Sequence, residues 1–189
     1  MNLLIVLAVG STAACGATDD SSGGNVNADT AKTFAALMQR PNIEDATQQY
    51  LAIDTELRQS LSREITSLKT WANGSEGSRA SCAGDYPGID ADGVTSSLAS
   101  HIVAGNLPDS DYEKALTVIG TVAQKYGFTP QPQRLHDSPG SHDAVFHNAH
   151  DDGEISFGTA QNTSLRINLG CHLTAVAKKR GTPAPAPTD

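Results

Sequence analysis

Histidine and aspartate side chains gather in one segment of the chain and have the chemistry of metal ligands. Four of the six histidines lie within fifteen residues: His136, His142, His147 and His150. Four aspartates accompany them: Asp137, Asp143, Asp151 and Asp152. Imidazole and carboxylate groups are ligands that Zn²⁺, Ni²⁺ and Cu²⁺ accept. The segment predicts either a metal site or a solvated turn region. Strand alternation favours the turn region, because it separates His147 from His150 unless the strand ends at Asn148.

The sequence has no motif for nucleophilic catalysis. Ser141, His142 and Asp143 are adjacent, whereas a catalytic triad is assembled by geometry from distant segments. Gly-x-Ser-x-Gly, His-Glu-x-x-His and glycine-rich phosphate loops do not occur in the sequence. We therefore predict a protein that is not an enzyme and uses no cofactor. An enzyme with dispersed catalytic residues is the alternative, and a pocket of paired, buried titratable groups would reveal it.

Charge and length narrow the class of protein further. The 189 residues carry a formal net charge of −8. This charge argues against nucleic-acid binding and against electrostatic docking on an anionic membrane, since both need clustered lysine and arginine. With 38% hydrophobic residues, the chain predicts one domain with a modest core.

The first residues have the pattern of an export signal. Leu3 to Val9 form an apolar run that is too short to span a membrane, and Thr12-Ala13-Ala14-Cys15-Gly16 follows. This resembles the lipobox of bacterial lipoproteins, so residues 1–14 are predicted to be a signal peptide and Cys15 the acylated N-terminus. Two acyl chains anchor a protein stably where one does not. The alternative is cleavage near Ala13, which leaves Cys15 as a free thiol.

The signal departs from the lipobox pattern in two respects. Thr12 occupies a position where leucine is usual, and residues 1–15 contain no lysine or arginine. Because export signals begin with a positively charged region, we expect the true start to lie upstream of Met1.

The two other cysteines predict a disulfide. If Cys15 is acylated, Cys82 and Cys171 remain as an even pair in an oxidising compartment. A bond between them would close a long loop and stabilise the fold by roughly 4–5 kcal/mol on the chain-entropy model. A redox-active pair is the competing interpretation, but the sequence has no Cys-x-x-Cys spacing.

Composition divides the chain into segments. Residues 15–28 are small and polar and predict a flexible tether. Residues 178–189 alternate proline and alanine near their end and predict a disordered tail. A single domain is expected over residues 29–177.

Helical periodicity marks the first half of this domain. A short helix is expected over residues 30–38, and a long amphipathic one from Asn42 to Asn73-Gly74. A second main helix is expected after Pro108, with a capping box of Ser110 and Glu113 and a stop at Gly127. The apolar stripe of the long helix consists of Tyr50, Ile53, Leu57, Leu61, Ile65, Leu68 and Trp71.

The last third of the domain has the pattern of strands. Residues 97–103 could form a strand or a helical turn, and residues 128–140 predict an extended crossing because of their prolines. Residues 143–149, 154–160 and 163–173 predict an antiparallel meander. In the last strand, Leu165, Ile167, Leu169 and Cys171 share one face, and Arg166, Asn168 and His172 share the other. The expected fold class is α+β, a two-layer sandwich with the two main helices packed on the C-terminal antiparallel sheet.

The order of these features resembles the LppA-type lipoproteins of mycobacteria and other actinobacteria. The resemblance covers residues 15–173 and is carried by four features: the lipobox at Cys15, the helix exit 123–127, the mid-chain Cys82 and the final strand 165–171. It implies a cell-envelope lipoprotein without an assigned activity and supplies no catalytic residue. The expected function is therefore non-catalytic binding or scaffolding, on the extracytoplasmic face of the cell membrane. The alternative is a metal-binding lipoprotein that uses residues 136–152.

Overall fold

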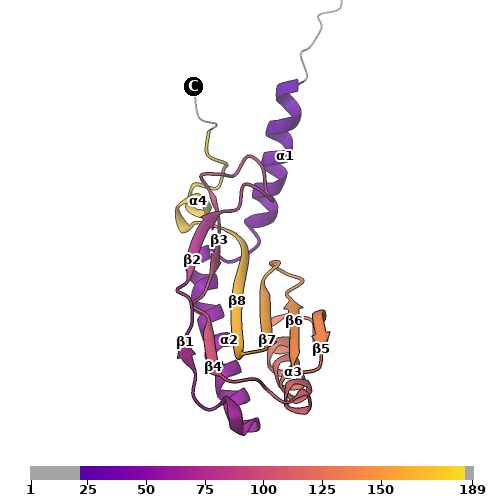
Figure 1. Cartoon of the computed structure of the whole chain (residues 1–189). Helices are drawn as coiled ribbons and strands as arrows, with labels where there is room; N and C mark the ends of the chain where they lie inside the picture. The colour runs from indigo at the N-terminus through magenta and orange to yellow at the C-terminus, as the bar shows by residue number, and fades with distance from the viewer. Residues whose placement is uncertain (1–21, 186–189) are drawn as a thin grey trace, which may run out of the picture.

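The computed structural model describes residues 22–185, and its fold is the predicted α+β sandwich (Figure 1). The described helices are α1 (Ser22–Leu37), α2 (Ile43–Glu64), α3 (Asp109–Ala123) and α4 (Ala175–Arg180), with short 3-10 helices η1 (Thr66–Leu68) and η2 (Gln124–Tyr126). The strands are β1 (Ala72–Asn73), β2 (Ser78–Ser81), β3 (Gly93–Ser97), β4 (His101–Ala104), β5 (Gln133–Ser138), β6 (Ser141–His147), β7 (Glu154–Thr159) and β8 (Asn162–Leu173).

All eight strands form one antiparallel sheet with β8 at its centre (Figure 1). The order is β1-β4-β8-β7-β6-β5, and β3 pairs with both β2 and β8. One edge of β8 pairs with β4 near its start and with β3 near its end, while β7 pairs with its other edge. The predicted meander of the last three strands is confirmed as β6, β7 and β8. The predicted crossing over residues 128–140 contains an additional edge strand, β5, paired with β6.

Helices α2 and α3 pack on one face of this sheet and enclose the main core. The Asn42 side chain caps α2 by accepting a hydrogen bond from the Asp45 N–H, and Glu44 and Asp45 lie in the first turn. The predicted stripe on α2 is buried against Ile119 of α3 and Phe146 of β6.

Two predicted helix ends are wrong. Helix α2 ends at Glu64, because Ile65 is extended (φ −129°, ψ 111°) and η1 follows, stabilised by a hydrogen bond from Ser62 Oγ to the Leu68 carbonyl. Helix α3 has Pro108 at its N-cap and no side-chain cap. Ser110 is therefore inside the first turn, and Glu113 pairs with Arg134 instead of closing a capping box.

A bulge where β3 meets β8 changes which face the side chains of β8 occupy. Val94 and Ser96 are two residues apart, but their partners His172 and Leu169 are three apart. Leu169 consequently belongs to the main core, whereas Cys171 belongs to a second buried cluster. That cluster consists of Phe34, Leu37, Cys82, Ile89, Cys171, Leu173 and Ala177. The prediction that His172 lies on a polar face is wrong, since its exposed fraction is 0%.

Both ends of the described chain differ from the predicted segment boundaries. Helix α1 begins at Ser22, inside the expected tether, and its last turns pack Phe34 and Leu37 into the second cluster. Helix α4 extends to Arg180, which pairs with the buried Asp92, and the Ala184 N–H donates to the same carboxylate. These contacts hold residues 178–185 against the domain, where a disordered tail was expected.

Within residues 22–185, no helix is both long and apolar enough to cross a bilayer. Cys15 and the predicted signal peptide lie outside the described residues.

Candidate functional site

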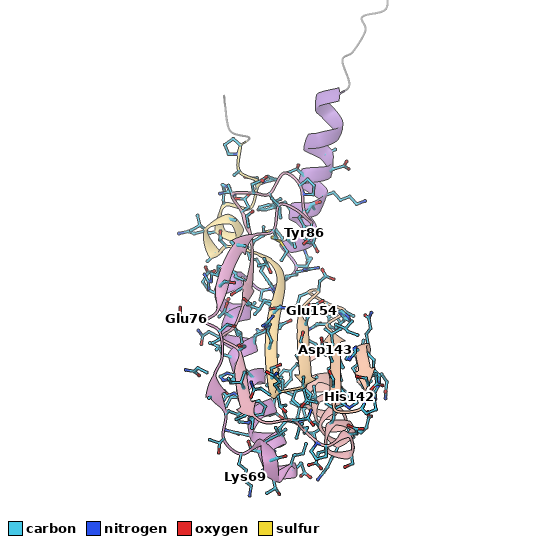
Figure 2. The ribbon with its side chains drawn as sticks, viewed as in Figure 1. Lys69, Glu76, Tyr86, His142, Asp143 and Glu154 are labelled. Carbon is cyan, nitrogen blue, oxygen red and sulfur yellow. A yellow bond between two sulfur atoms is a disulfide. The ribbon has the colours of Figure 1, made fainter. Side chains whose placement is uncertain are left out.

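The four histidines of the predicted metal segment lie apart in the structure. His142 is buried, with Nδ1 2.6 Å from Asp137 and Nε2 3.0 Å from Asp109. His147 contacts Gln133 and Glu154. The His136 side chain hydrogen-bonds with Ser138, and His150 is exposed on the loop after β6. Figure 2 shows His142 and Glu154 at separate places on the β6–β7 half of the sheet. Among residues 22–185, no three His, Cys, Asp or Glu side chains are grouped to hold a metal, so the metal-binding alternative has no support.

Asp151 and Asp152 of the same segment instead belong to a polar network beside a groove. The groove has a volume of about 810 Å³, within the usual range of ligand sites. Its walls are the end of α1 with the following turn, residues 49–53 of α2, Tyr126 and the loop between β6 and β7. These elements come from three distant parts of the chain, residues 36–53, 126 and 148–151, so the fold itself creates the groove.

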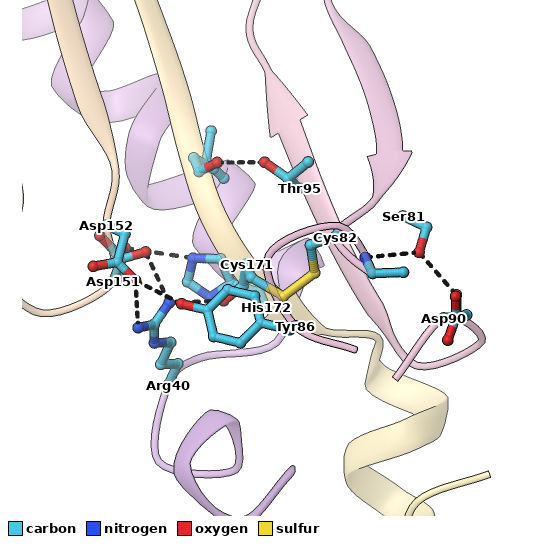
Figure 3. Close-up of a disulfide and its surroundings, with 12 residues drawn as sticks. Arg40, Ser81, Cys82, Tyr86, Asp90, Thr95, Asp151, Asp152, Cys171 and His172 are labelled. Atoms are coloured by element: carbon cyan, nitrogen blue, oxygen red, sulfur yellow. Dashed lines mark hydrogen bonds and ion pairs between the residues drawn. A yellow bond between two sulfur atoms is a disulfide. The ribbon is translucent and has the colours of Figure 1, made fainter. Parts of the chain in front are cut away.

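Arg40 fixes the loop between β6 and β7 to the rest of the domain (Figure 3). Its Nη1 donates to the carbonyls of Asp151 and Cys171, at 2.9 and 3.0 Å, and its Nη2 donates to Asp152 Oδ2 at 2.8 Å. The Tyr86 hydroxyl donates to the same Asp152 oxygen at 2.8 Å. The hydrogen bonds from Arg40 and Tyr86 lower the pKa of Asp152.

Asp151 is the buried centre of the network. The Tyr50 hydroxyl lies 2.8 and 2.9 Å from its two oxygens, and the Gly153 N–H donates to Oδ1. Burial alone raises the pKa of Asp151, but the nearby His172 imidazole and the hydrogen bonds from Tyr50 and the Gly153 N–H outweigh it, and the net effect lowers the pKa. Burial, followed by the adjacent Asp151 charge, raises the pKa of Tyr50 well above its ordinary value. Tyr50 therefore acts as a hydrogen-bond donor here.

His172 joins this network from β8. Its Nδ1 lies 3.0 Å from the Pro41 carbonyl, which can only accept, so Nδ1 carries a proton. Its Nε2 lies 3.4 Å from Asp151 Oδ2, at ion-pair distance but without an aligned hydrogen bond. His172 thus connects β8, the turn after α1 and the β6–β7 loop beneath the groove.

Close backbone contacts make the loop rigid. A Cβ on Gly153 would lie 1.9 Å from the Tyr50 hydroxyl oxygen, and a Cβ on Gly170 would lie 1.5 Å from the Asp151 carbonyl oxygen. Asp152 has φ +63°, and it is the only residue other than glycine with a positive φ in the described chain. Such a conformation persists where surrounding contacts impose it, and it is common at functional sites.

The disulfide adjoins this network. Cys82 is bonded to Cys171, with Cα atoms 5.8 Å apart, and Figure 3 shows the bond beside Tyr86 and His172. The bond connects the segment after β2 to the end of β8, one residue before His172.

Sequence reasoning missed most of this site. The sequence places Asp151 and Asp152 in a metal site or turn region, Tyr50 on the apolar stripe of the long helix, and His172 on the face of the last strand opposite Leu169. No local pattern in the sequence indicates the role of Arg40, because its partners are more than 100 residues away in sequence.

Comparison with known proteins identifies the family. A model of the LppA family, described as "Lipoprotein confined to pathogenic Mycobacterium", matches residues 19–175. The chain belongs to the LppA family. The resemblance inferred from the sequence is thereby confirmed, and the protein is a member of a lipoprotein family. No curated protein matches the sequence.

Two solved structures are similar to this LppA-family chain. The lipoprotein LppA from Mycobacterium tuberculosis is 15% identical, with a TM-score of 0.64 over 88% of this chain and 99% of that one. At this identity the match shows a shared fold. A DUF4853 family protein from Actinomyces odontolyticus ATCC 17982 is 14% identical, with a TM-score of 0.45 over 79% of this chain and 73% of that one.

Proposed function

We propose that this protein is anchored through an acylated Cys15 to the extracytoplasmic face of the cell membrane and acts there as a non-catalytic binding module. The observation that carries the proposal is the match to a lipoprotein family over residues 19–175, which begins just after the lipobox at Cys15. The partner of the protein is then the membrane, through the lipid, together with whatever occupies the groove.

The arrangement of the helices is consistent with this anchoring. Helices α1 and α4 lie at one end of the molecule, and α1 begins seven residues after Cys15 (Figure 1). The groove includes the last residues of α1. An anchored domain would therefore hold the groove on the half of the molecule that is nearer to the membrane.

Binding fits the groove better than catalysis. Asp151, Tyr50 and His172 are paired groups in a pocket, as a dispersed active site would require. However, all three are buried: Tyr50 hydrogen-bonds to Asp151, and His172 hydrogen-bonds to the Pro41 carbonyl. The side chains of Gln39, Gln49 and His150 are exposed at the groove, and amides and imidazole are groups that recognise ligands.

The anchor is tested by intact mass measurement of protein extracted from membranes. We expect a chain that starts at Cys15 and carries at least two acyl chains, while a Cys15→Ser variant is recovered unacylated in the soluble fraction. An unacylated wild-type mass would refute the anchor.

The binding role is tested separately by native mass spectrometry of the extracted protein. Ala52→Trp places an indole in the groove, whereas Thr55→Trp adds the same side chain elsewhere on the exposed surface of α2. A bound molecule that is retained by wild type and Thr55→Trp and lost from Ala52→Trp would support binding. Equal retention by both variants would contradict it.

A further inference from the structure

We infer that the groove binds an uncharged carbohydrate, an inference that rests on the binding role proposed above. Three features lead to this ligand class: the pairing of the charged groups among the described residues of the groove, the kind of polar group at the rim, and an exposed aromatic ring on one wall.

The charged groups at the groove already have partners. The donors of Arg40 serve two carbonyls and Asp152. Asp151 accepts from Tyr50 and Gly153 and faces His172. Beside Tyr126, Lys125 pairs with Glu56 at 2.6 Å. An ionic ligand would therefore lose its hydration without gaining a free counter-charge, which is unfavourable. An uncharged ligand does not incur this cost.

The unengaged polar groups at the groove can both donate and accept hydrogen bonds. Within the described residues, the side chains of Gln39, Gln49 and His150 make no hydrogen bond to another protein group. A side-chain amide and a neutral imidazole each offer a donor and an acceptor. Sugar hydroxyls also do both, so a carbohydrate can satisfy these three side chains without any change of charge.

One wall of the groove provides a surface for a sugar ring. Tyr126 is 37% exposed, and its hydroxyl donates to Glu56 Oε2 at 2.5 Å, which fixes the ring. Its electron-rich face suits the weakly positive C–H groups of a pyranose. Ala36 and Ala52 on the helices of the groove have small side chains, which leaves room above them for a flat ring.

The openness of the site agrees with a glycan that runs along the surface. The groove is formed by exposed residues of α1 and α2 over the buried Ile53 and Tyr50. A neutral peptide could also pair with the three rim side chains through its N–H and C=O groups, but a sugar ring, unlike an aliphatic peptide, offers a flat face of weakly positive C–H groups to the Tyr126 ring. We therefore commit to the carbohydrate and treat a peptide as an outcome of the test.

The experiment uses the full chain with Cys15→Ser, so that no acyl chain competes for the groove. Maltotriose, cellotriose and chitotriose are titrated separately and followed by amide NMR, with the neutral peptide acetyl-Ala-Leu-Ala-Leu-amide as comparison. We expect one sugar to shift the side-chain amides of Gln39 and Gln49. Gln49→Ala should weaken its binding about two- to tenfold, as expected for one hydrogen bond.

Matched variants separate groove binding from other effects. Tyr126→Ala should weaken binding by about tenfold, and Tyr126→Phe should retain it, since the ring remains. Ala52→Trp should abolish binding, and Thr55→Trp should not. The amide spectrum and the mass of the oxidised chain establish that each variant is folded.

Three results would overturn the inference. The first is that no sugar shifts these amides, and the second is that Ala52→Trp binds as wild type does. The third is that the peptide binds in place of the sugars, which refutes the carbohydrate but preserves the binding role. The binding role itself would be refuted if the protein extracted from membranes retained no ligand in native mass spectrometry. None of these results bears on the acylation of Cys15.

Discussion

Two buried histidines in opposite halves of the sheet, His172 and His142, differ in their surroundings and in how they stabilise the fold. His172 lies beneath the groove, fully buried, between the Pro41 carbonyl and Asp151. His142 lies on β6 at the other half and stacks on Tyr112 with ring centroids 4.6 Å apart. Its two nitrogens face Asp137 and Asp109, whose side chains are 49% and 59% exposed.

The difference lies in what surrounds each imidazole. His172 is part of an interior in which the disulfide, Arg40 and the close contacts at Gly153 and Gly170 impose one geometry. His142 is held by carboxylates that water reaches, and only the imidazolium can donate to both of them. The groove half is thus stabilised mainly by covalent and buried contacts, and the hairpin half by charges that respond to pH.

The largest expected effect comes from breaking the disulfide of the groove half. A Cys82→Ala, Cys171→Ala double variant opens a loop of sequence separation 89 and should lose about 4–5 kcal/mol of the free energy of unfolding. Urea denaturation measures the loss. Cys15→Ala is the control, since it lies outside this loop and should leave the free energy unchanged. A loss below about 1 kcal/mol would mean that the buried contacts hold this half without the bond.

Removing one hydroxyl from the interior should have the next largest effect. Tyr50→Phe deprives the buried Asp151 of a donor, which should cost about 1–3 kcal/mol. Tyr126→Phe removes an exposed hydrogen bond to Glu56 and should cost no more than about 0.5 kcal/mol. Denaturant midpoints of the two variants give the comparison directly. Equal losses would show that Asp151 finds a replacement donor.

The hairpin half should lose stability as the pH rises. Hydrogen bonding to Asp109, and then to Asp137, raises the pKa of His142, although burial opposes this. The folded state favours the charged form of His142. The contribution of His142 to the free energy of unfolding is therefore complete below the pKa of the unfolded state, about 6.5. It is lost as the pH rises through the higher folded value.

Histidine NMR titration and unfolding measured across this range test the prediction. Asp109→Asn and Asp137→Asn should each lower the pKa of His142 and flatten the dependence of stability on pH. The same two variants should leave the groove amides unchanged. A His142 pKa at or below about 6.5 in wild type would contradict the two-carboxylate geometry.

The smallest expected effect on stability concerns Asp152, the residue with a positive φ in the loop between β6 and β7. Asp152→Asn keeps an oxygen for Arg40 and Tyr86, and asparagine tolerates a positive φ. The side chain of Asp152 is 62% exposed, so loss of its charge should cost only about 0–1 kcal/mol. Asp152→Ala removes both contacts in the same backbone geometry and should cost more. Thermal melts of the pair rank them, and equal losses would show that the charge, which both variants remove, holds the loop rather than the two hydrogen bonds.

Local sequence signals predicted the elements but not the site. The stripe from Tyr50 to Leu61 and the strands β6, β7 and β8 follow from spacing alone, because helix and strand periods are local properties. The strand β5 was missed because Pro130 and Pro132 indicate a break, although both precede its first residue. The network of Arg40, Asp151 and His172 depends on contacts across the whole fold, which no spacing in the sequence encodes.

The bulge between β3 and β8 decides which side chains of β8 reach the disulfide and Asp151. If β8 paired with β3 in plain alternation, with its length unchanged and no bulge, Cys171 would lie on the same face as Leu169, towards α2. Its sulfur would then point away from Cys82, and His172 would point away from Asp151. A change of register at this bulge would therefore remove the disulfide and the contact of His172 with Asp151 together, and Gly170 beside it has no room for a side chain against the Asp151 carbonyl.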